Sequence, residues 1–192
     1  FGEKLGWERP NWFADANLGE VPKDEYSFGR QNWFDAVGRE HKAVREACVL
    51  FDQTSFAKFS LKGPDAAKAL NWIAANNIDR PVGSLVYTQM LNDRGGIECD
   101  LTVARIALDE FYIVTGTGFA THGFNWIKRN IPNGMNCELF DFTSSNAVLS
   151  LMGPRARDLL SQVTRDDVSN DSFKFATSKT IAVAGCRVLA MR

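Results

Sequence analysis

The stretch Tyr87-Thr88-Gln89-Met90-Leu91-Asn92-Asp93-Arg94-Gly95-Gly96-Ile97-Glu98-Cys99-Asp100-Leu101-Thr102-Val103 decides the local fold, because it predicts a β-hairpin. We predict a strand over residues 86–91, a turn over residues 92–96 and a return strand over residues 97–106. The turn contains Asn, Asp and Gly, the residues that tolerate the positive φ of tight hairpin turns.

Asp100 is the unexpected residue of this hairpin. It stands in a run with Ile97, Leu101, Val103 and Ile106. An acid is unfavourable in such a strand and costly to bury without a partner. Two interpretations follow: Asp100 faces solvent, or it is held in a pocket for a purpose.

The segments around the hairpin alternate between strand and helix patterns without a regular β-α-β-α order. Apolar side chains recur every three to four residues over residues 35–48, and residues 120–129 form a second short helical pattern. Residues 111–115 and 136–141 have strand patterns. This order favours an α+β fold with antiparallel sheets and flanking helices.

Residues 56–70 and residues 146–160 form an internal repeat. Both are strand patterns that end in Ser-Leu-x-Gly-Pro and lead into a helix. Gly ends the strand, and Pro stands at the helix start, where its missing N–H costs nothing. The offset is too long for a solenoid. We therefore predict two similar half-units related by a pseudo-two-fold, the second of them truncated, whose strands and following helices superpose.

Composition excludes several classes of function. The 192 residues are 45% hydrophobic, and 22 basic and 23 acidic side chains give a net charge of −1. Such a balance does not fit the concentrated basic face of a nucleic-acid-binding protein. No apolar run approaches the ~20 residues of a membrane span. The 4 cysteines lack Cys-x-x-Cys spacing, which predicts reduced, mostly buried thiols in a reducing compartment rather than a zinc site.

Neither a metal nor a dinucleotide site is indicated. His41 and His122 are far apart and have no second ligand at metal spacing. Gly116-Thr117-Gly118 is followed by Thr121 where a dinucleotide fingerprint requires a third glycine. We expect no metal, and no flavin bound by these residues.

The two ends of the chain carry separate information. Residues 1–34 hold three of the 5 tryptophans with little regular periodicity, so we predict an irregular aromatic segment. It either lies over the core of its own domain or faces a preceding domain. The chain stops at Arg192, beside the strand-like run of residues 180–191. We therefore expect a piece of a longer protein.

Residues 87–103 resemble the folate-binding hairpin of aminomethyltransferases, the T-proteins of the glycine cleavage system, through Tyr-x-x-Met-Leu-Asn-x-x-Gly-Gly-Ile-x-x-Asp-Leu-x-Val. Residues 91–103 are similar, more closely still, to the C-terminal half of sarcosine and dimethylglycine dehydrogenases. Those enzymes fuse a flavin amine oxidase domain to a T-protein-like domain. The resemblance covers nearly the whole chain and is most specific at residues 1–13 and 87–103.

The resemblance implies roles for six residues. In T-proteins the acid of the motif faces the reactive nitrogens of tetrahydrofolate, so Asp100 would be the catalytic carboxylate that stabilises passing positive charge. Tyr87 takes the place of the pocket tyrosine, whose flat apolar ring and polar tip suit a pterin; the alternative is a half-buried strand aromatic. The other implied folate-binding residues are Phe56, Met90, Thr115 and Gly116.

For the whole protein, the resemblance implies the tetrahydrofolate-binding, one-carbon-transfer portion of a flavin-dependent N-methylamine dehydrogenase that forms methylenetetrahydrofolate. Residues 1–34 would follow an absent upstream FAD domain, and residues 35–192 would form the T-protein-like domain. The substrates would be folate and a small methylated amine. The location would be the bacterial cytoplasm or the mitochondrial matrix.

The sequence departs from the family pattern at two points, and two alternatives stay open. T-proteins have two adjacent acids where this chain has Cys99-Asp100; Asp100 matches the functional one. The Tyr, Glu and Arg that clamp the pterin in the family lie beyond residue 192, so the chain would hold only part of the site. The alternatives are a stand-alone aminomethyltransferase, against which the aromatic N-terminal segment argues, and a non-catalytic binding domain of the same fold.

Overall fold

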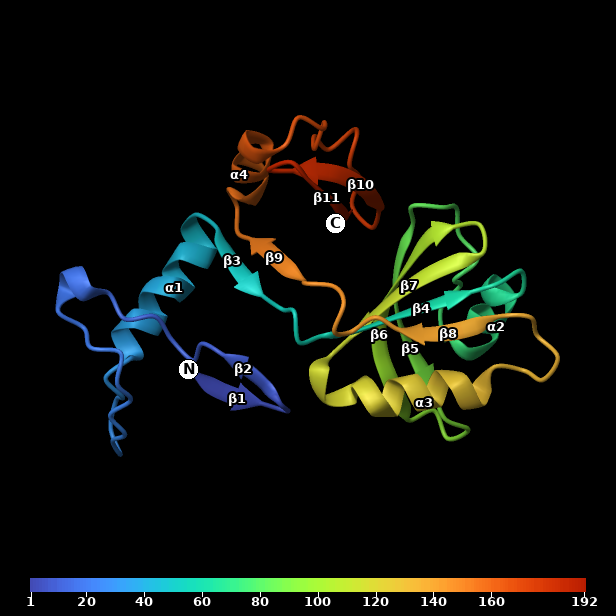
Figure 1. The fold of residues 1–192 in the computed structure, drawn as a ribbon, viewed down its shortest axis with the longest axis horizontal. Helices are drawn as coiled ribbons and strands as arrows, with labels where there is room; N and C mark the ends of the chain where they lie inside the picture. The colour runs from blue at the N-terminus through green and yellow to red at the C-terminus, as the bar shows by residue number, and fades with distance from the viewer. The chain divides into compact units, whose positions relative to one another are not determined.

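The computed structural model describes residues 1–192, which form two compact units (Figure 1). Unit 1 comprises residues 1–51 and 149–159, and unit 2 comprises residues 52–148 and 160–192. The main helices of the chain are α1 (Phe34–Glu46), α2 (Ala66–Ile73), α3 (Ala120–Asn130) and α4 (Ala156–Val163). With the strands described below, they confirm the predicted α+β class.

Unit 2 contains a five-stranded antiparallel sheet in the order β5-β6-β7-β4-β8. Its strands are β4 (Ala57–Lys62), β5 (Leu85–Leu91), β6 (Ile97–Ala107), β7 (Glu110–Thr115) and β8 (Glu138–Asp141). The predicted hairpin is therefore confirmed as β5 and β6, with its turn over residues 92–96. Asn92 organises that turn, because its Oδ1 accepts the N–H groups of Arg94 and Gly96.

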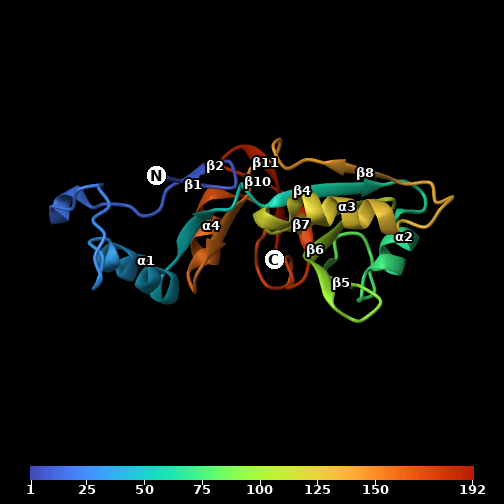
Figure 2. The same cartoon turned by 90° about the horizontal axis from the view of Figure 1, so that it is seen from below.

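One face of this sheet forms the core of unit 2. Phe59, Phe111 and Ile113 are fully buried on it and pack with Leu70 of α2 and Ile127 of α3. Both helices lie against the sheet in the two ribbon views (Figures 1 and 2). Alternation along the strands sends the intervening side chains to the opposite face, where the candidate site lies.

A second hairpin completes unit 2. Its strands are β10 (Ser178–Val183) and β11 (Cys186–Met191), joined by Ala184 and Gly185. A small apolar cluster of Val168, Phe173 and Ile181 supports it. The strand-like run of residues 180–191 is thus two strands.

Unit 1 begins with a hairpin that the sequence did not predict. The strands β1 (Gly2–Lys4) and β2 (Trp7–Arg9) pair in antiparallel fashion, so the expectation of an irregular start is wrong for these residues. Their two-residue turn has φ of 54° at Leu5 and 83° at Gly6. Positive φ at both central positions gives the twist that hairpins favour. Leucine rarely adopts it, which hid the turn from pattern analysis.

The rest of unit 1 combines an aromatic segment with a strand pair. The ring of Trp33 stacks on that of Trp12, with 6.5 Å between the ring centroids, and contacts the ring of Tyr26 edge-on, with 5.5 Å between the centroids. Tyr26 and the nearby Phe28 are nevertheless exposed to solvent. A 3-10 helix, η1 (Ala16–Leu18), precedes α1. The strands β3 (Val49–Asp52) and β9 (Leu149–Met152) form a separate two-stranded sheet.

The internal repeat is confirmed in local structure. β4 leads through Gly63 into α2, and β9 leads through Gly153 into α4. Gly63 has φ +141° and Gly153 has φ +128°. A Cβ on Gly63 would lie 2.4 Å from the carbonyl oxygen of Asn136, and a Cβ on Gly153 would lie 2.4 Å from that of Ala47. β9 begins later than predicted, at Leu149.

Two chain segments exchange equivalent hydrogen bonds in unit 2. The Gln53 N–H donates to the Val148 carbonyl at 2.8 Å, and the Phe142 N–H donates to the Lys58 carbonyl at 2.8 Å. The Lys58 side chain is fully buried there. Its ammonium donates to the carbonyls of Thr54 at 2.6 Å and Asn146 at 2.7 Å, so one buried cation ties the two segments together.

We expect the stability contribution of Lys58 to increase with pH. Burial lowers the pKa of Lys58 below its ordinary value of 10.5. Between the lowered pKa and 10.5 the unfolded chain binds more protons than the folded one, so the free energy of unfolding increases with pH in that window. Urea unfolding at pH 7 and pH 10 measures this for wild type and Lys58→Met. The wild type should gain stability relative to the variant at pH 10; a constant or reversed difference would contradict the expected titration.

The four cysteines differ in burial. All four thiols are free: Cys99 is buried, Cys48 and Cys137 are half-buried, and Cys186 is exposed. The prediction of mostly buried thiols is therefore only partly right. No helix in residues 1–192 combines the length and apolar character needed to cross a membrane.

Candidate functional site

Three polar side chains from neighbouring strands meet on the helix-free face of the five-stranded sheet. Tyr87 and Gln89 stand two residues apart on β5, so they point to the same side, and Gln89 pairs directly with Asp100 on β6. The Gln89 Nε2 donates to Asp100 Oδ1 at 3.1 Å. Asp100 is exposed, and Tyr87 is 63% exposed. The sequence left open whether Asp100 faces solvent or is held in a pocket. In the structure its carboxylate is exposed to solvent and hydrogen-bonded to neighbouring side chains.

The three groups influence one another electrostatically. Hydrogen bonding with Asp100 raises the pKa of Tyr87, because the carboxylate favours the protonated phenol. The phenol is therefore neutral throughout the physiological range and acts as a donor. The site presents a carboxylate, a phenol and a primary amide side by side.

Thr115 supports this group from the neighbouring strand. Its Oγ1 donates to the backbone carbonyl of Asp100 at 2.7 Å, and its side chain is almost fully buried. Thr115 thus anchors the backbone of Asp100 rather than lining an open surface. Gly116 follows it and precedes η2 (Thr117–Phe119). Phe56, half-buried, lies immediately before β4.

The structure does not bring Met90 to this face. Met90 is fully buried in the core of unit 2, where it pairs with Cys99. Side chains at odd spacings along a strand point to opposite faces of the sheet. Met90 is three residues from Tyr87 and one from Gln89, so it points away from the face that carries both of them. The expectation that Met90 lines the pocket is therefore wrong, because its side chain lies on the core side of β5.

Gln89 is the residue at the site that sequence reasoning missed. Strand alternation gave part of the signal, because Gln89 is two residues from Tyr87 and points to the same side of β5. Its pairing with Asp100 could not be predicted from the turn, because the register shifts by one residue between Met90 and Leu91. The family resemblance implies roles for Asp100 and Tyr87 and none for the amide of Gln89.

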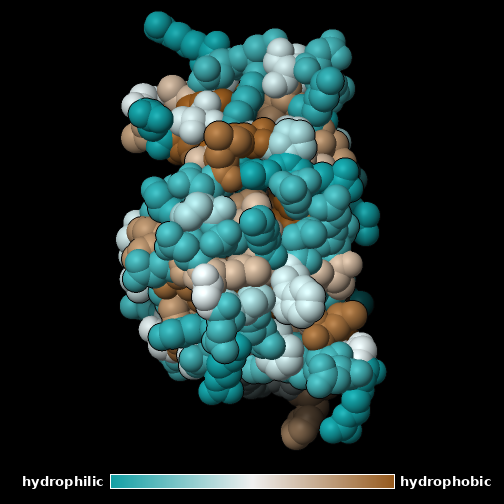
Figure 3. Space-filling view, turned by 90° about the vertical axis from the view of Figure 1, so that its right-hand side faces the viewer, coloured by the Kyte–Doolittle hydropathy of each residue, from teal (hydrophilic) through white to brown (hydrophobic).

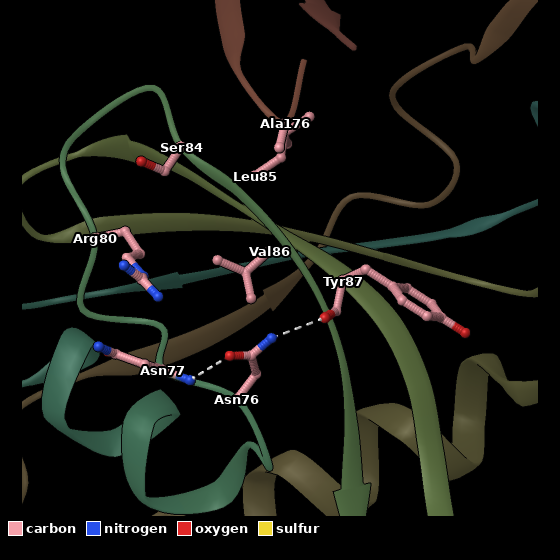
Figure 4. Close-up of a pocket in the computed structure, with 8 residues that line it drawn as sticks. All are labelled: Asn76, Asn77, Arg80, Ser84, Leu85, Val86, Tyr87 and Ala176. Carbon is pink, nitrogen blue, oxygen red and sulfur yellow. Dashed lines mark hydrogen bonds between the residues drawn. The ribbon is translucent and has the colours of Figure 1, made fainter. Parts of the chain in front are cut away.

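A shallow hollow of about 280 Å³ lies beside the first half of β5, the outermost strand of the five-stranded sheet (Figure 4). Its lining residues are Asn76, Asn77, Arg80, Ser84, Leu85, Val86, Tyr87 and Ala176. Figure 4 shows the Tyr87 ring pointing away from the other residues that line this hollow, while the Tyr87 carbonyl accepts from Asn76 Nδ2 at 3.4 Å. The hollow and the polar group therefore share Tyr87, but neither Gln89 nor Asp100 lines the hollow.

The Asp100 carboxylate is exposed to solvent. On the face of the molecule that Figure 3 shows, hydrophilic residues predominate, with smaller hydrophobic areas between them. The exposed carboxylate can accept an N–H and stabilise a positive charge, with the Tyr87 ring beside it as an apolar plate.

Comparisons with known proteins agree with this fold. The chain matches the family described as GCVT N-terminal domain over residues 1–192. It is 40% identical over its whole length to 4-methylaminobutanoate oxidase (formaldehyde-forming) of Paenarthrobacter nicotinovorans, covering 23% of that protein. It is 35% identical to human mitochondrial sarcosine dehydrogenase, again over the whole chain and 25% of that protein. The chain thus spans about a quarter of these relatives.

A solved structure shows the same fold. The glycine cleavage system aminomethyltransferase T from Bartonella henselae superposes with a TM-score of 0.67 at 23% identity. The match covers 81% of this chain and 43% of that one.

Proposed function

The chain belongs to the GCVT N-terminal domain family, and we propose that it is the tetrahydrofolate-binding, one-carbon-transfer portion of a flavin-dependent N-methylamine dehydrogenase or oxidase. The proposal rests on the exposed Asp100 carboxylate, held by Gln89 beside Tyr87. The relatives that span the whole chain are named for the oxidation of methylated amines. An upstream FAD domain and a small methylated amine substrate belong to the same proposal.

The residues present fit tetrahydrofolate as the acceptor of the one-carbon unit. Tetrahydrofolate supplies nucleophilic amine nitrogens. Asp100 would accept an N–H from the ligand and stabilise positive charge as it develops there. Tyr87 would offer its ring to an aromatic part of the ligand and its neutral hydroxyl as a donor.

The aromatic segment would face the proposed upstream domain. In unit 1, Tyr26 is exposed although its ring contacts Trp33, and Phe28 is also exposed. Exposed apolar groups of this kind mark interaction surfaces. This observation favours a fused protein over a stand-alone aminomethyltransferase, the alternative from the same family.

Titration of the longer protein with tetrahydrofolate, together with product analysis, tests the proposal. With sarcosine as the amine, added tetrahydrofolate should bind and shift the one-carbon product from formaldehyde to methylenetetrahydrofolate. The name of the Paenarthrobacter relative describes it as formaldehyde-forming. If formaldehyde alone forms at saturating folate, the chain transfers no one-carbon unit; if folate does not bind, the folate site itself is refuted.

A further inference from the structure

We propose that Gln89 is the positioning residue that fixes the orientation of the Asp100 carboxylate for its ligand. The inference rests on the proposed function and identifies a residue that neither the motif nor the family description assigns. Its basis is a direct cross-strand contact: Gln89 pairs with Asp100 in the β5–β6 register, and its Nε2 lies 3.1 Å from Asp100 Oδ1.

The backbone and the side chain of Asp100 are held by different groups. Thr115 fixes the backbone, through the hydrogen bond of its Oγ1 to the Asp100 carbonyl. The exposed side chain would otherwise rotate freely between rotamers. Gln89 is half-buried as a residue, and its exposed amide restricts this rotation through the hydrogen bond to Asp100 Oδ1. The carboxylate is thereby oriented before a ligand arrives.

This arrangement defines the chemistry that the site offers. The Gln89 amide engages Oδ1 of Asp100, and the Tyr87 phenol is also hydrogen-bonded to the carboxylate, so a ligand meets the remaining acceptor capacity of Asp100. The Gln89 Oε1 is a second acceptor beside it, because an amide bears both a donor and an acceptor. Two adjacent acceptors, one of them charged, suit a ligand with neighbouring N–H groups or a cationic amine. A ligand that presents only acceptors, such as a carboxylate, would be disfavoured there. The site therefore selects ligands that present hydrogen-bond donors or a positive charge.

A double-mutant cycle in the longer protein tests the inference, with the Kd for tetrahydrofolate as the readout. Gln89→Leu keeps the approximate size of the side chain and removes the amide. We expect the Kd to rise about tenfold, or about 1.4 kcal/mol. In the Asp100→Ala background the same change should have almost no further effect, because the group that Gln89 orients is gone. Gln162→Leu makes the same chemical change on the exposed side of α4 and should leave the Kd unchanged.

The outcomes separate this inference from the proposed function. If the wild type does not bind tetrahydrofolate, the proposed function fails. If it binds and Asp100→Ala weakens binding, while Gln89→Leu matches the wild type, only the positioning role fails. Full additivity of the two substitutions would also overturn it, because Gln89 would then contact the ligand independently of Asp100. A circular dichroism spectrum and melting temperature within the wild-type range show that a weakened variant is folded.

Discussion

Asp100→Asn should uncouple amine oxidation from one-carbon capture. The substitution keeps the shape of the side chain and removes its charge, and Asp100 is exposed on β6, so the fold should be preserved. The oxidation step, which the proposal assigns to another domain, should continue nearly unchanged. Transfer to tetrahydrofolate should fall by roughly 10²-fold, the typical effect of removing one preorganised electrostatic contact.

The product distribution measures this effect directly. Formaldehyde should replace methylenetetrahydrofolate, because the oxidised amine hydrolyses before it is captured. Asp93→Asn is the matched control: it makes the same change in the turn of the same hairpin, where Asp93 is exposed. That variant should retain the wild-type product ratio. An unchanged ratio in Asp100→Asn would show that Asp100 is only a solvated strand acid.

The hairpin was predictable because local chemistry determines it. Asn92 and Gly95 specify the turn: Asn92 Oδ1 accepts two backbone N–H groups, and Gly95 adopts φ of 77°. Alternation then determines which side chains are buried. The same rule places Met90 on the core side of β5 and Gln89 on the side of Tyr87, whereas the sequence motif alone does not distinguish the two faces of the strand.

The repeat was predictable at its Gly-Pro ends but extends further than the pattern suggested. Residues 48–52 read Cys-Val-Leu-Phe-Asp, and residues 137–141 read Cys-Glu-Leu-Phe-Asp. In each copy the Asp Oδ1 accepts the N–H two residues later, from Thr54 at 2.9 Å and from Thr143 at 2.8 Å. A one-residue difference in the following loop interrupts the alignment and concealed this part of the repeat.

Two other features lay beyond sequence reasoning. The burial of Lys58 depends on the carbonyls of Thr54 and Asn146, and Asn146 is brought there by a contact distant in the chain. The hairpin turn at Leu5 depends on a positive φ that leucine seldom adopts. In both cases tertiary structure overrides a local preference, which a single sequence does not record.

Gly63→Ala and Gly153→Ala should both be strongly destabilising, each on the order of 4 kcal/mol or more, the range of exceptional substitutions. Both positions combine a φ that L side chains rarely adopt with backbone atoms that cannot move aside. The added Cβ would lie 2.7 Å from the Cα of Cys137 or the Cα of Cys48, in addition to its contact with a carbonyl.

Gly134→Ala distinguishes the cost of a positive φ from the cost of a steric clash with the backbone. Gly134 has φ of +84°, but nothing lies within 4 Å of a Cβ there, so the substitution should cost only the ~1–2 kcal/mol of the left-handed conformation. The free energies of unfolding of the three variants are compared by urea unfolding of residues 1–192, monitored by circular dichroism. Should one variant not fold, its loss of the native spectrum counts as the larger effect. The repeat predicts similar, large losses for Gly63→Ala and Gly153→Ala. If Gly153→Ala lowers the free energy of unfolding by no more than Gly134→Ala does, the backbone at Ala47 does not pack against Gly153 as closely as the backbone at Asn136 packs against Gly63. The two half-units would then not be equivalent in packing.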